Sequence, residues 1–111
     1  MAFPVKTAAG ATSGDASGNI TFATITMTEG TILSLQVAWT GQTTGVLILQ
    51  VSNDGTNFVD TAEVWPSNPA GATGSTAEVW SGFGYKFARL YYDWTSNTGA
   101  ATMTCYAEVK K

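Results

Sequence analysis

The sequence of 111 residues contains no histidine, one cysteine and few charged residues, which make up 12% of the chain. Without histidine, Ser-His-Asp and Cys-His catalytic pairings, His-ligated zinc and an imidazole general base are excluded. The single cysteine, Cys105, excludes an internal disulfide and an all-cysteine zinc site. Nothing basic lies near Cys105 in the sequence to lower its pKa, so we expect an inert buried thiol. We therefore expect no enzyme, no metal and no cofactor.

The balance of charge is also informative, because eight acidic residues against five basic ones give a formal net charge of −3. Nucleic-acid binding needs a basic stripe, so this balance argues against it. The start of the chain, residues 1–6, lacks the apolar run of a signal peptide, and no apolar stretch of about 18 residues is present to span a membrane. We expect a soluble protein that stays in the cytoplasm or in an assembly formed there.

From Asn19 onward, Thr, Val, Ile and aromatic residues are frequent and no segment keeps a 3.6-residue period. Apolar residues alternate over 33–39 and again over 103–109, which predicts two half-buried strands with Trp39 and Cys105 facing the core. Residues 46–51 form a nearly continuous apolar run, typical of a central strand. Seven or eight short strands at regular spacing predict an all-β fold, an antiparallel β-sandwich of jelly-roll type.

The first 18 residues differ from the rest, since after a short apolar start they are mostly Ala, Gly, Ser and Thr. Such a segment has too little to bury to hold itself in a core. We expect residues 1–18 to be a flexible terminus, or an arm that becomes ordered against a neighbouring subunit. Residues 19–111 are then the β-sandwich domain.

Several segments carry turn signals. Residues 52–55, Ser-Asn-Asp-Gly, predict a hairpin turn that leads into a partner strand at 57–61, because Asn and Gly tolerate positive φ. A calcium loop is the alternative here, but too few oxygen ligands lie nearby. Residues 41–45 and 96–99 are predicted to be turns, and a bulge or a bend is expected near Ala23 and Thr24, where the apolar alternation changes phase.

Residues 61–65, Thr-Ala-Glu-Val-Trp, recur letter for letter at 76–80, and the ten residues between the copies include two prolines and two glycines. We predict two short strands that flank a long exposed loop. Glu63 and Glu78 occupy equivalent places, as a glycosidase pair would require. Nothing else supports that reading, and glutamates on a solvated sheet face are ordinary.

Aromatic residues give the strongest indication of binding. Some lie in or beside Gly- and Pro-rich loops, where they could cap the core, form a protein interface or stack on a sugar. Tyr85, Phe87 and Tyr91 share a face with Arg89, which we expect to pair with Asp93 or Glu108 or to stack on a ring. With the apolar start of the chain, the candidate partner-binding residues are Phe3, Pro4, Val5, Trp65, Pro66, Trp80 and Phe83.

Five segments in a fixed order carry a resemblance to a known family. They are residues 35–41 (LQVAWTG), 49–58 (LQVSNDGTNF), 85–92 (YKFARLYY), 95–99 (TSNTG) and 102–110 (TMTCYAEVK). Together they resemble the capsid decoration, or staple, proteins of short-tailed phages of the epsilon-15 kind, over about residues 31–110.

This resemblance implies a jelly-roll-like sandwich on the outer capsid surface of a virion assembled in the host cytoplasm. The protein would clamp neighbouring subunits of the major capsid protein together, as a homodimer. Two alternatives stay open, a carbohydrate-binding module that uses its loop aromatics and another virion component of the tail or neck.

Overall fold

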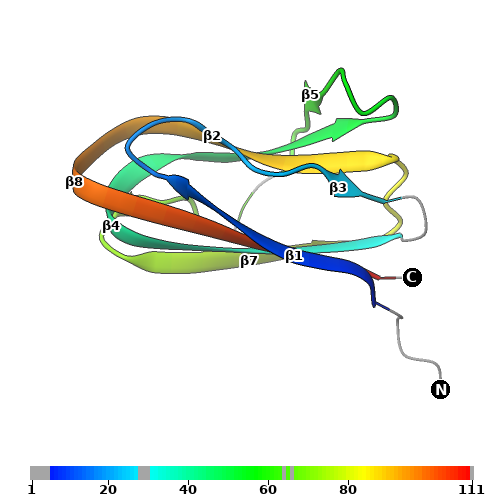
Figure 1. Ribbon diagram of the computed structural model, residues 1–111, viewed down its shortest axis with the longest axis horizontal. Helices are drawn as coiled ribbons and strands as arrows, with labels where there is room; N and C mark the ends of the chain where they lie inside the picture. The colour runs from blue at the N-terminus through cyan, green and yellow to red at the C-terminus, as the bar shows by residue number, and fades with distance from the viewer. Residues whose placement is uncertain (1–5, 28–30, 64, 66, 111) are drawn as a thin grey trace.

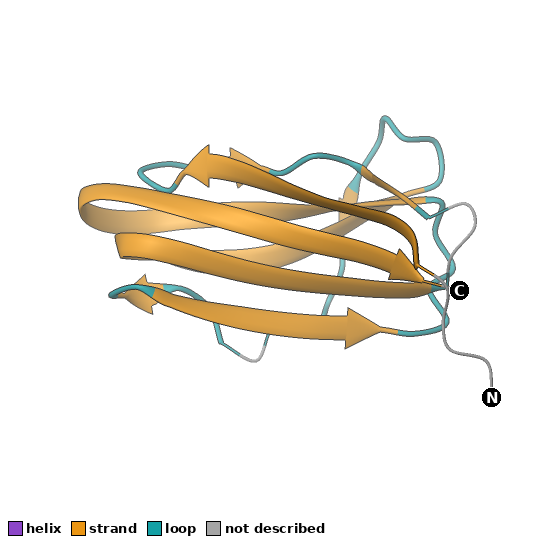
Figure 2. Ribbon diagram, turned by 60° about the horizontal axis from the view of Figure 1, so that its bottom comes forward, coloured by secondary structure: helices purple, strands orange, loops and turns teal. Residues whose placement is uncertain are grey.

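The computed structural model describes residues 6–27, 31–63, 65 and 67–110 and confirms an antiparallel all-β fold. Figure 2 shows that strands make up most of this part of the chain. No helix able to span a membrane occurs among the described residues. In chain order the strands are β1 (Lys6–Asp15), β2 (Ile20–Thr21), β3 (Ile25–Thr26), β4 (Ile32–Ser52), β5 (Val59–Asp60), β6 (Ala70–Gly71), β7 (Gly74–Trp80) and β8 (Phe87–Lys110).

Two long strands form the frame of the molecule. β4 and β8 pair along their whole length, from Ile32 opposite Lys110 to Ser52 opposite Phe87. Midway along, both strands bend back, so that one continuous sheet folds over on itself into two layers (Figure 1).

The bend in β4 is made possible by Gly41, which has φ of +85°. A side chain at this position would clash with the carbonyl oxygen of Ala100. Between the pairs on either side of the bend, β4 has only Gly41, whereas β8 has residues 99–101. This bulge lets β8 take the longer path around the bend. The prediction of turns at 41–45 and 96–99 is therefore wrong, because both segments remain paired within continuous strands.

Each layer is four strands wide, and in the second layer two short strands share each edge position. The first runs in the order β1, the C-terminal half of β8, the N-terminal half of β4 and β7. The second places the N-terminal half of β8 and the C-terminal half of β4 between β2 and β3 on one side and β5 and β6 on the other. The register of β8 shifts by one residue between its pairs with β2 and β3, which confirms the bulge expected near Ala23 and Thr24.

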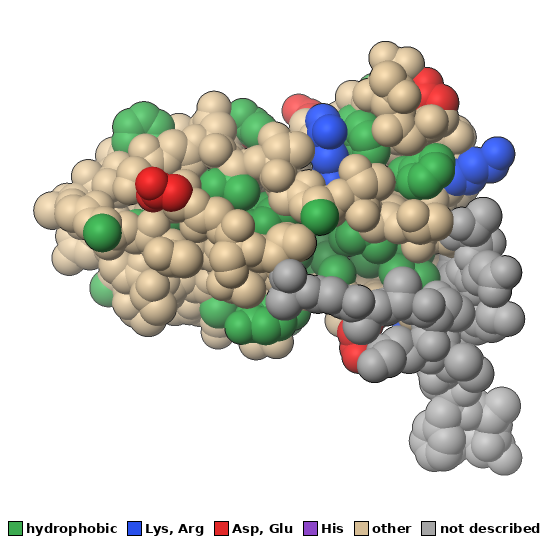
Figure 3. Space-filling view, in the orientation of Figure 1, with side chains coloured by type: hydrophobic (Ala, Val, Ile, Leu, Met, Phe, Trp, Pro, Cys, Tyr) green, Lys and Arg blue, Asp and Glu red, His purple; other side chains and the backbone are tan. Residues whose placement is uncertain are grey.

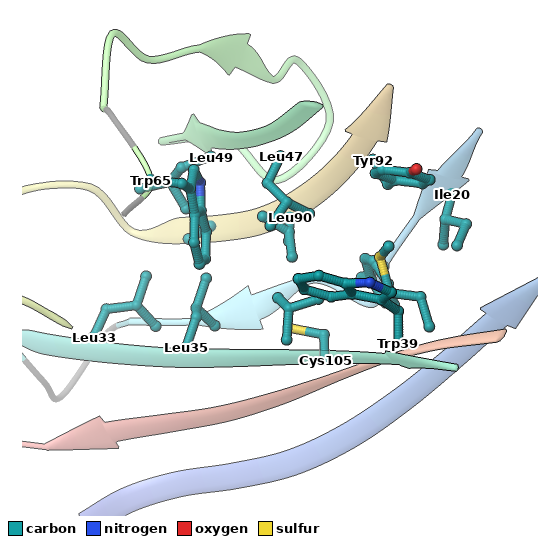
Figure 4. Packing of buried hydrophobic residues seen from close by; sticks show 14 of the residues in the cluster. Ile20, Leu33, Leu35, Trp39, Leu47, Leu49, Trp65, Leu90, Tyr92 and Cys105 are labelled. Carbon is teal, nitrogen blue, oxygen red and sulfur yellow. The ribbon is translucent and has the colours of Figure 1, made fainter. Parts of the chain in front are cut away.

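The core fills the space between the layers (Figure 4). The alternation predicted over 33–39 is confirmed, and Cys105 is buried on β8, the neighbouring strand of the same layer. In the second layer Tyr92 is fully buried, and its hydroxyl shares a hydrogen bond of 2.7 Å with Thr43. The buried apolar residues of the two long strands are Leu33, Leu35, Val37, Trp39, Leu47, Leu49, Val51, Ala88, Leu90, Tyr92, Ala101, Met103, Cys105 and Val109.

The N-terminal segment differs from the arm expected for residues 1–18. Residues 6–15 form β1, which pairs with residues 102–110 of the same chain. The amide of Ala16 then donates a hydrogen bond of 2.9 Å to the carbonyl of Ala101. Backbone groups alone can make a sheet ladder, so small polar side chains do not prevent a strand at an edge. Residues 6–15 therefore belong to the sheet rather than to an arm outside it.

The hairpin turn at residues 52–55 is confirmed. One carboxylate oxygen of Asp54 accepts hydrogen bonds of 2.8 Å from the amides of Thr56 and Asn57. Gly55 has φ of +78°, as the turn requires. The chain then returns as β5, which pairs with residues 50 and 51 of β4.

Candidate functional site

Trp65, predicted to bind a partner, is a core residue instead, with only 5% of its surface exposed. Figure 4 shows its ring standing between Leu49 and Leu35, which lie on the two halves of β4. Its ring meets that of Trp80 edge to face, with centroids 5.5 Å apart. The ring fills space between the two layers. Trp65 therefore closes the core and is unavailable to a partner.

The other loop aromatics are partly buried. The indole of Trp80 donates a hydrogen bond of 2.9 Å to Glu63, and Phe83 packs edge-on against Tyr85, with ring centroids 5.7 Å apart. Of these residues Tyr85 is the most open, at 46% exposure. Phe3, Pro4, Val5 and Pro66, also predicted to bind a partner, lie outside the described residues.

The two copies of the repeat adopt different structures. Residues 76–80 belong to β7, whereas residues 61–63 and 65 are not in a strand, so the prediction of two flanking strands is half wrong. Glu63 accepts a hydrogen bond from the indole of Trp80, and Glu78 accepts one of 2.9 Å from the backbone amide of Val79. Each carboxylate therefore has its own hydrogen-bond donor, and only Glu78 lies on a strand.

A cavity of about 290 Å³ opens between β1 and β3. Figure 3 shows hydrophobic side chains gathered on this edge, between the two strands. Burial raises the pKa of Cys105, one of the lining residues, to about 12, so its thiol stays protonated at neutral pH. The lining supports an apolar occupant and no nucleophilic chemistry. It consists of Thr12, Phe22, Ala23, Thr24, Ile25, Thr26, Leu90, Cys105, Ala107 and Val109.

No group of three or more potential metal-ligating residues occurs in the part of the chain that the structure describes. Besides this cavity, the outer faces of the two layers are candidate functional surfaces. Both are built from residues that alternate with the buried ones along β4 and β8.

The outer face of the first layer has small, mostly uncharged side chains around one exposed aromatic ring. Tyr106 of β8 is 48% exposed and lies opposite Gln36 of β4, which lies opposite Ala77 of β7. An ion pair of 3.3 Å between Lys110 and Glu108 lies at one end. We call this surface the Tyr106 face, and it consists of Ser34, Gln36, Ala38, Ser75, Ala77, Val79, Thr104, Tyr106 and Glu108.

The outer face of the second layer is built around the single arginine. The Nε of Arg89 donates a hydrogen bond of 2.7 Å to the side chain of Gln50, and its guanidinium carbon lies 4.0 Å from the ring centroid of Phe58. The side-chain amide of Gln50 donates in turn to Asp60 at 2.7 Å. Of the alternatives for Arg89, stacking on a ring is therefore confirmed. Among the described residues it forms no ion pair with a carboxylate.

Apolar side chains continue this second face beyond the arginine. Tyr91 and Ile48 lie opposite each other across β8 and β4, and both are half-buried. Val46, one step further along β4, is 46% exposed. The expectation that Phe87 and Tyr91 share a face with Arg89 is confirmed by their alternation along β8. We call this surface the Arg89 face, and it consists of Val46, Ile48, Gln50, Phe58, Phe87, Arg89 and Tyr91.

The sequence does not single out Tyr106, and it gives no sign of the contact between Arg89 and Gln50. That contact depends on the register of β4 against β8, which puts these two residues opposite each other although they lie 39 positions apart. Comparison of the sequence with models of known protein families and with curated proteins gives no match. Function is therefore inferred from the sequence and from these two faces.

Proposed function

We propose that this chain is a non-enzymatic structural protein of a phage virion. In this proposal it decorates the outer surface of an icosahedral capsid and stabilises the shell by bridging subunits of the major capsid protein. The ordered segments over residues 31–110 motivate the proposal, and the Tyr106 face is the structural observation that carries it. The order of strand segments in the two layers supports the jelly-roll interpretation of the fold.

The Tyr106 face shares two features with protein contact surfaces. Cores of such interfaces are depleted in charged residues and enriched in tyrosine. Small side chains such as Ala77 and Ser34 let another surface come close to the sheet. Tyr106 and Val79, at 48% and 57% exposure, supply apolar area that water would otherwise cover.

Binding of this kind stabilises a shell by mass action. A protein that binds the assembled shell and not its free subunits favours assembly by RT ln(1 + [L]/Kd), about 2.7 kcal/mol per site at a hundredfold excess over Kd. Because a shell repeats the same site many times, modest contacts add up to substantial resistance to heat.

Among the described residues β1 pairs with β8 alone, and its other edge supports self-association as a homodimer. Edge strands in natural proteins are usually short, bent or charged, which prevents pairing with other chains. Four edge strands have only two residues each: β2, β3, β5 and β6. The edge strand β7 has a charged residue, Glu78, opposite the inward-facing Leu35. By contrast, β1 has ten residues, with no charge or proline between Lys6 and Asp15.

Two copies of β1 are complementary to each other. In an antiparallel pair about a two-fold axis that passes through Ala11, the Lys6 end of each strand lies beside the Asp15 end of the partner's strand. Both ends of the shared ladder then bring opposite charges together. The first layers of the two copies would merge into one sheet, with one Tyr106 face on each half.

The proposed function is tested on shells assembled with and without this protein. Shells that carry it are expected to release their contents at a higher temperature, measured by the fluorescence of a dye that binds exposed nucleic acid. Tyr106→Ala is expected to remove most of this protection. Val59→Ala, at an exposed position of the other layer, is the control. Equal release temperatures with and without the protein would contradict the stapling role.

The same particles test the alternatives. Gold-labelled antibody is expected over the head, whereas label confined to the tail would favour a tail or neck component. The carbohydrate-binding alternative has lost part of its basis, because the ring of Trp65 is buried in the core.

A further inference from the structure

The guanidinium of Arg89 is held in one orientation and leaves its far end available. Its Nε is bound to Gln50, its flat side lies on Phe58, and Gln50 is itself fixed by Asp60. Its two terminal amino groups form no hydrogen bond and no ion pair with the described residues. A half-buried, oriented fork of donors therefore faces outward from the second layer.

This arrangement lowers the cost of binding an anion. A free arginine side chain carries about 2 kcal/mol of rotamer entropy, part of which is lost whenever it forms a fixed contact. At Arg89 the side chains of Gln50 and Phe58 have already restricted that freedom. The two oxygens of a carboxylate can then accept one hydrogen bond from each terminal amino group at the same time.

The surroundings decide which anion fits. Asp60 lies beside Gln50, Asp93 is on the same outward side of β8, and the whole chain has a net charge of −3. These negative charges disfavour a phosphate dianion or a nucleic acid more than a single carboxylate. Ile48 and Tyr91 extend the face with apolar surface, which suits a protein segment better than a small free acid.

We propose that the Arg89 face is a second contact surface, where the guanidinium binds an Asp or Glu side chain flanked by apolar residues on the shell. This inference rests on the proposed function and adds to it, because bridging needs two contacts. The Tyr106 face and the Arg89 face lie on opposite layers (Figure 1). One molecule can therefore touch two neighbouring subunits.

Co-sedimentation with assembled shells tests this contact with two variants of the arginine. Arg89→Met keeps the stacking on Phe58 and removes the charge, and it is expected to weaken binding about 10- to 100-fold. Arg89→Lys keeps the charge and loses the planar fork, and it is expected to recover only part of the affinity. Lys86→Met, at an exposed cation outside the Arg89 face, is the matched control and should bind like the unaltered chain.

A second measurement identifies the group that is bound. Shells are treated with a carbodiimide and a neutral amine, which convert exposed carboxylates to amides. The unaltered chain should then bind no better than Arg89→Met binds untreated shells.

The outcomes separate this inference from the proposed function. If the unaltered chain binds shells and Arg89→Met, shown to be folded by its circular dichroism, binds equally well, the Arg89 contact is wrong and the proposed function stands. If treated shells bind the chain undiminished, the carboxylate is the wrong ligand. If the unaltered chain does not bind shells at all, the proposed function fails and this contact with it.

Discussion

Trp39 and Trp65 have the same exposure of 5% but different hydrogen bonding. The indole of Trp39 donates to the carbonyl of Ala72 at 2.8 Å, whereas the indole nitrogen of Trp65 has no partner among the described residues. A buried donor without a partner destabilises the fold, and a satisfied one contributes about 1 kcal/mol. The two rings therefore differ in how well phenylalanine can replace them.

We expect Trp39→Phe to lower the free energy of unfolding by about 1 kcal/mol more than Trp65→Phe, because only the first change removes a hydrogen bond. Both variants lose similar ring volume, so each serves as the control for the other. Urea denaturation followed by circular dichroism measures the difference. Equal losses, or a larger loss for Trp65→Phe, would contradict the assignment of the two indoles.

Asp54 makes the stability of the fold depend on pH. Hydrogen bonds from the amide and side chain of Asn57, the amide of Thr56 and the hydroxyl of Ser52 hold the pKa of Asp54 well below its usual value. Its ionised form therefore stabilises the fold above its unfolded pKa of about 3.9, and this contribution is lost as the pH falls further.

Melting temperatures measured between about pH 7 and pH 2 test this point. Asp54→Asn is expected to melt at a lower temperature at pH 7 and to lose less on acidification than the unaltered chain. Asp15→Asn is the comparison. The pKa of Asp15 is also lowered, but by Ser17 alone, so its effect should be smaller. Parallel curves for Asp54→Asn and the unaltered chain would show that the turn makes no acid-sensitive contribution.

Some residue roles could be read from the sequence and others could not. The alternation of apolar residues around Trp39 and around Cys105 is a local property of the sequence. It predicts that both side chains face the core, and this prediction is confirmed. The burial of Trp65 and the contact of Arg89 with Gln50 depend on segments far apart in the chain. No local pattern at Trp65 distinguishes an exposed loop ring from one that closes a core.

At the level of strands, the bend in β4 is the feature on which the two layers depend. Gly41 needs both its positive φ and the absence of a side chain, since a Cβ would clash with the carbonyl oxygen of Ala100. Gly71 has a similar φ of +90°, but no atom lies within 4 Å of an added Cβ. Substitutions at these two glycines therefore distinguish the cost of backbone strain, which both incur, from the cost of a steric clash, which only Gly41 incurs.

Gly71→Ala is expected to lower the free energy of unfolding by about 1–2 kcal/mol, from strain alone. Gly41→Ala should lower the free energy of unfolding clearly more, because β8 must also move away from the added methyl group. Chemical denaturation of both variants measures the difference. If the two variants lost the same amount, close packing at the bend would not be needed for the fold.

Turn signals in the sequence predict a turn correctly at residues 52–55 and wrongly at 41–45 and 96–99. Residues 52–55 have an aspartate that binds the backbone locally, so the turn is fixed within a few residues. Glycine at 41 and at 99 permits a sharp change of direction without requiring a turn. Whether the chain turns or bends there is decided by pairing between β4 and β8. For β1 the deciding factor is likewise a distant strand rather than its own composition.

For the whole molecule, the edge of β1 predicts a dimer that can be weakened by one charge. Ala11→Lys places two like charges near the proposed two-fold axis and is expected to shift the protein from dimer to monomer. Ala77→Lys is the matched control, because Ala77 lies in the same row of the sheet on the opposite edge strand.

Sedimentation equilibrium at several concentrations gives the mass of each variant. A dimeric Ala11→Lys protein, or an unaltered chain that is monomeric at every concentration, would contradict pairing through β1.

We propose that this chain binds an assembled protein shell and transforms no substrate. Co-sedimentation of the purified, unaltered chain with assembled shells, compared with the same amount of unassembled capsid subunits, tests it most directly. We expect saturable binding to shells, at a fixed ratio to capsid subunits, and much weaker binding to free subunits. A chain that stays in the supernatant at concentrations above those of the shell sites would contradict it.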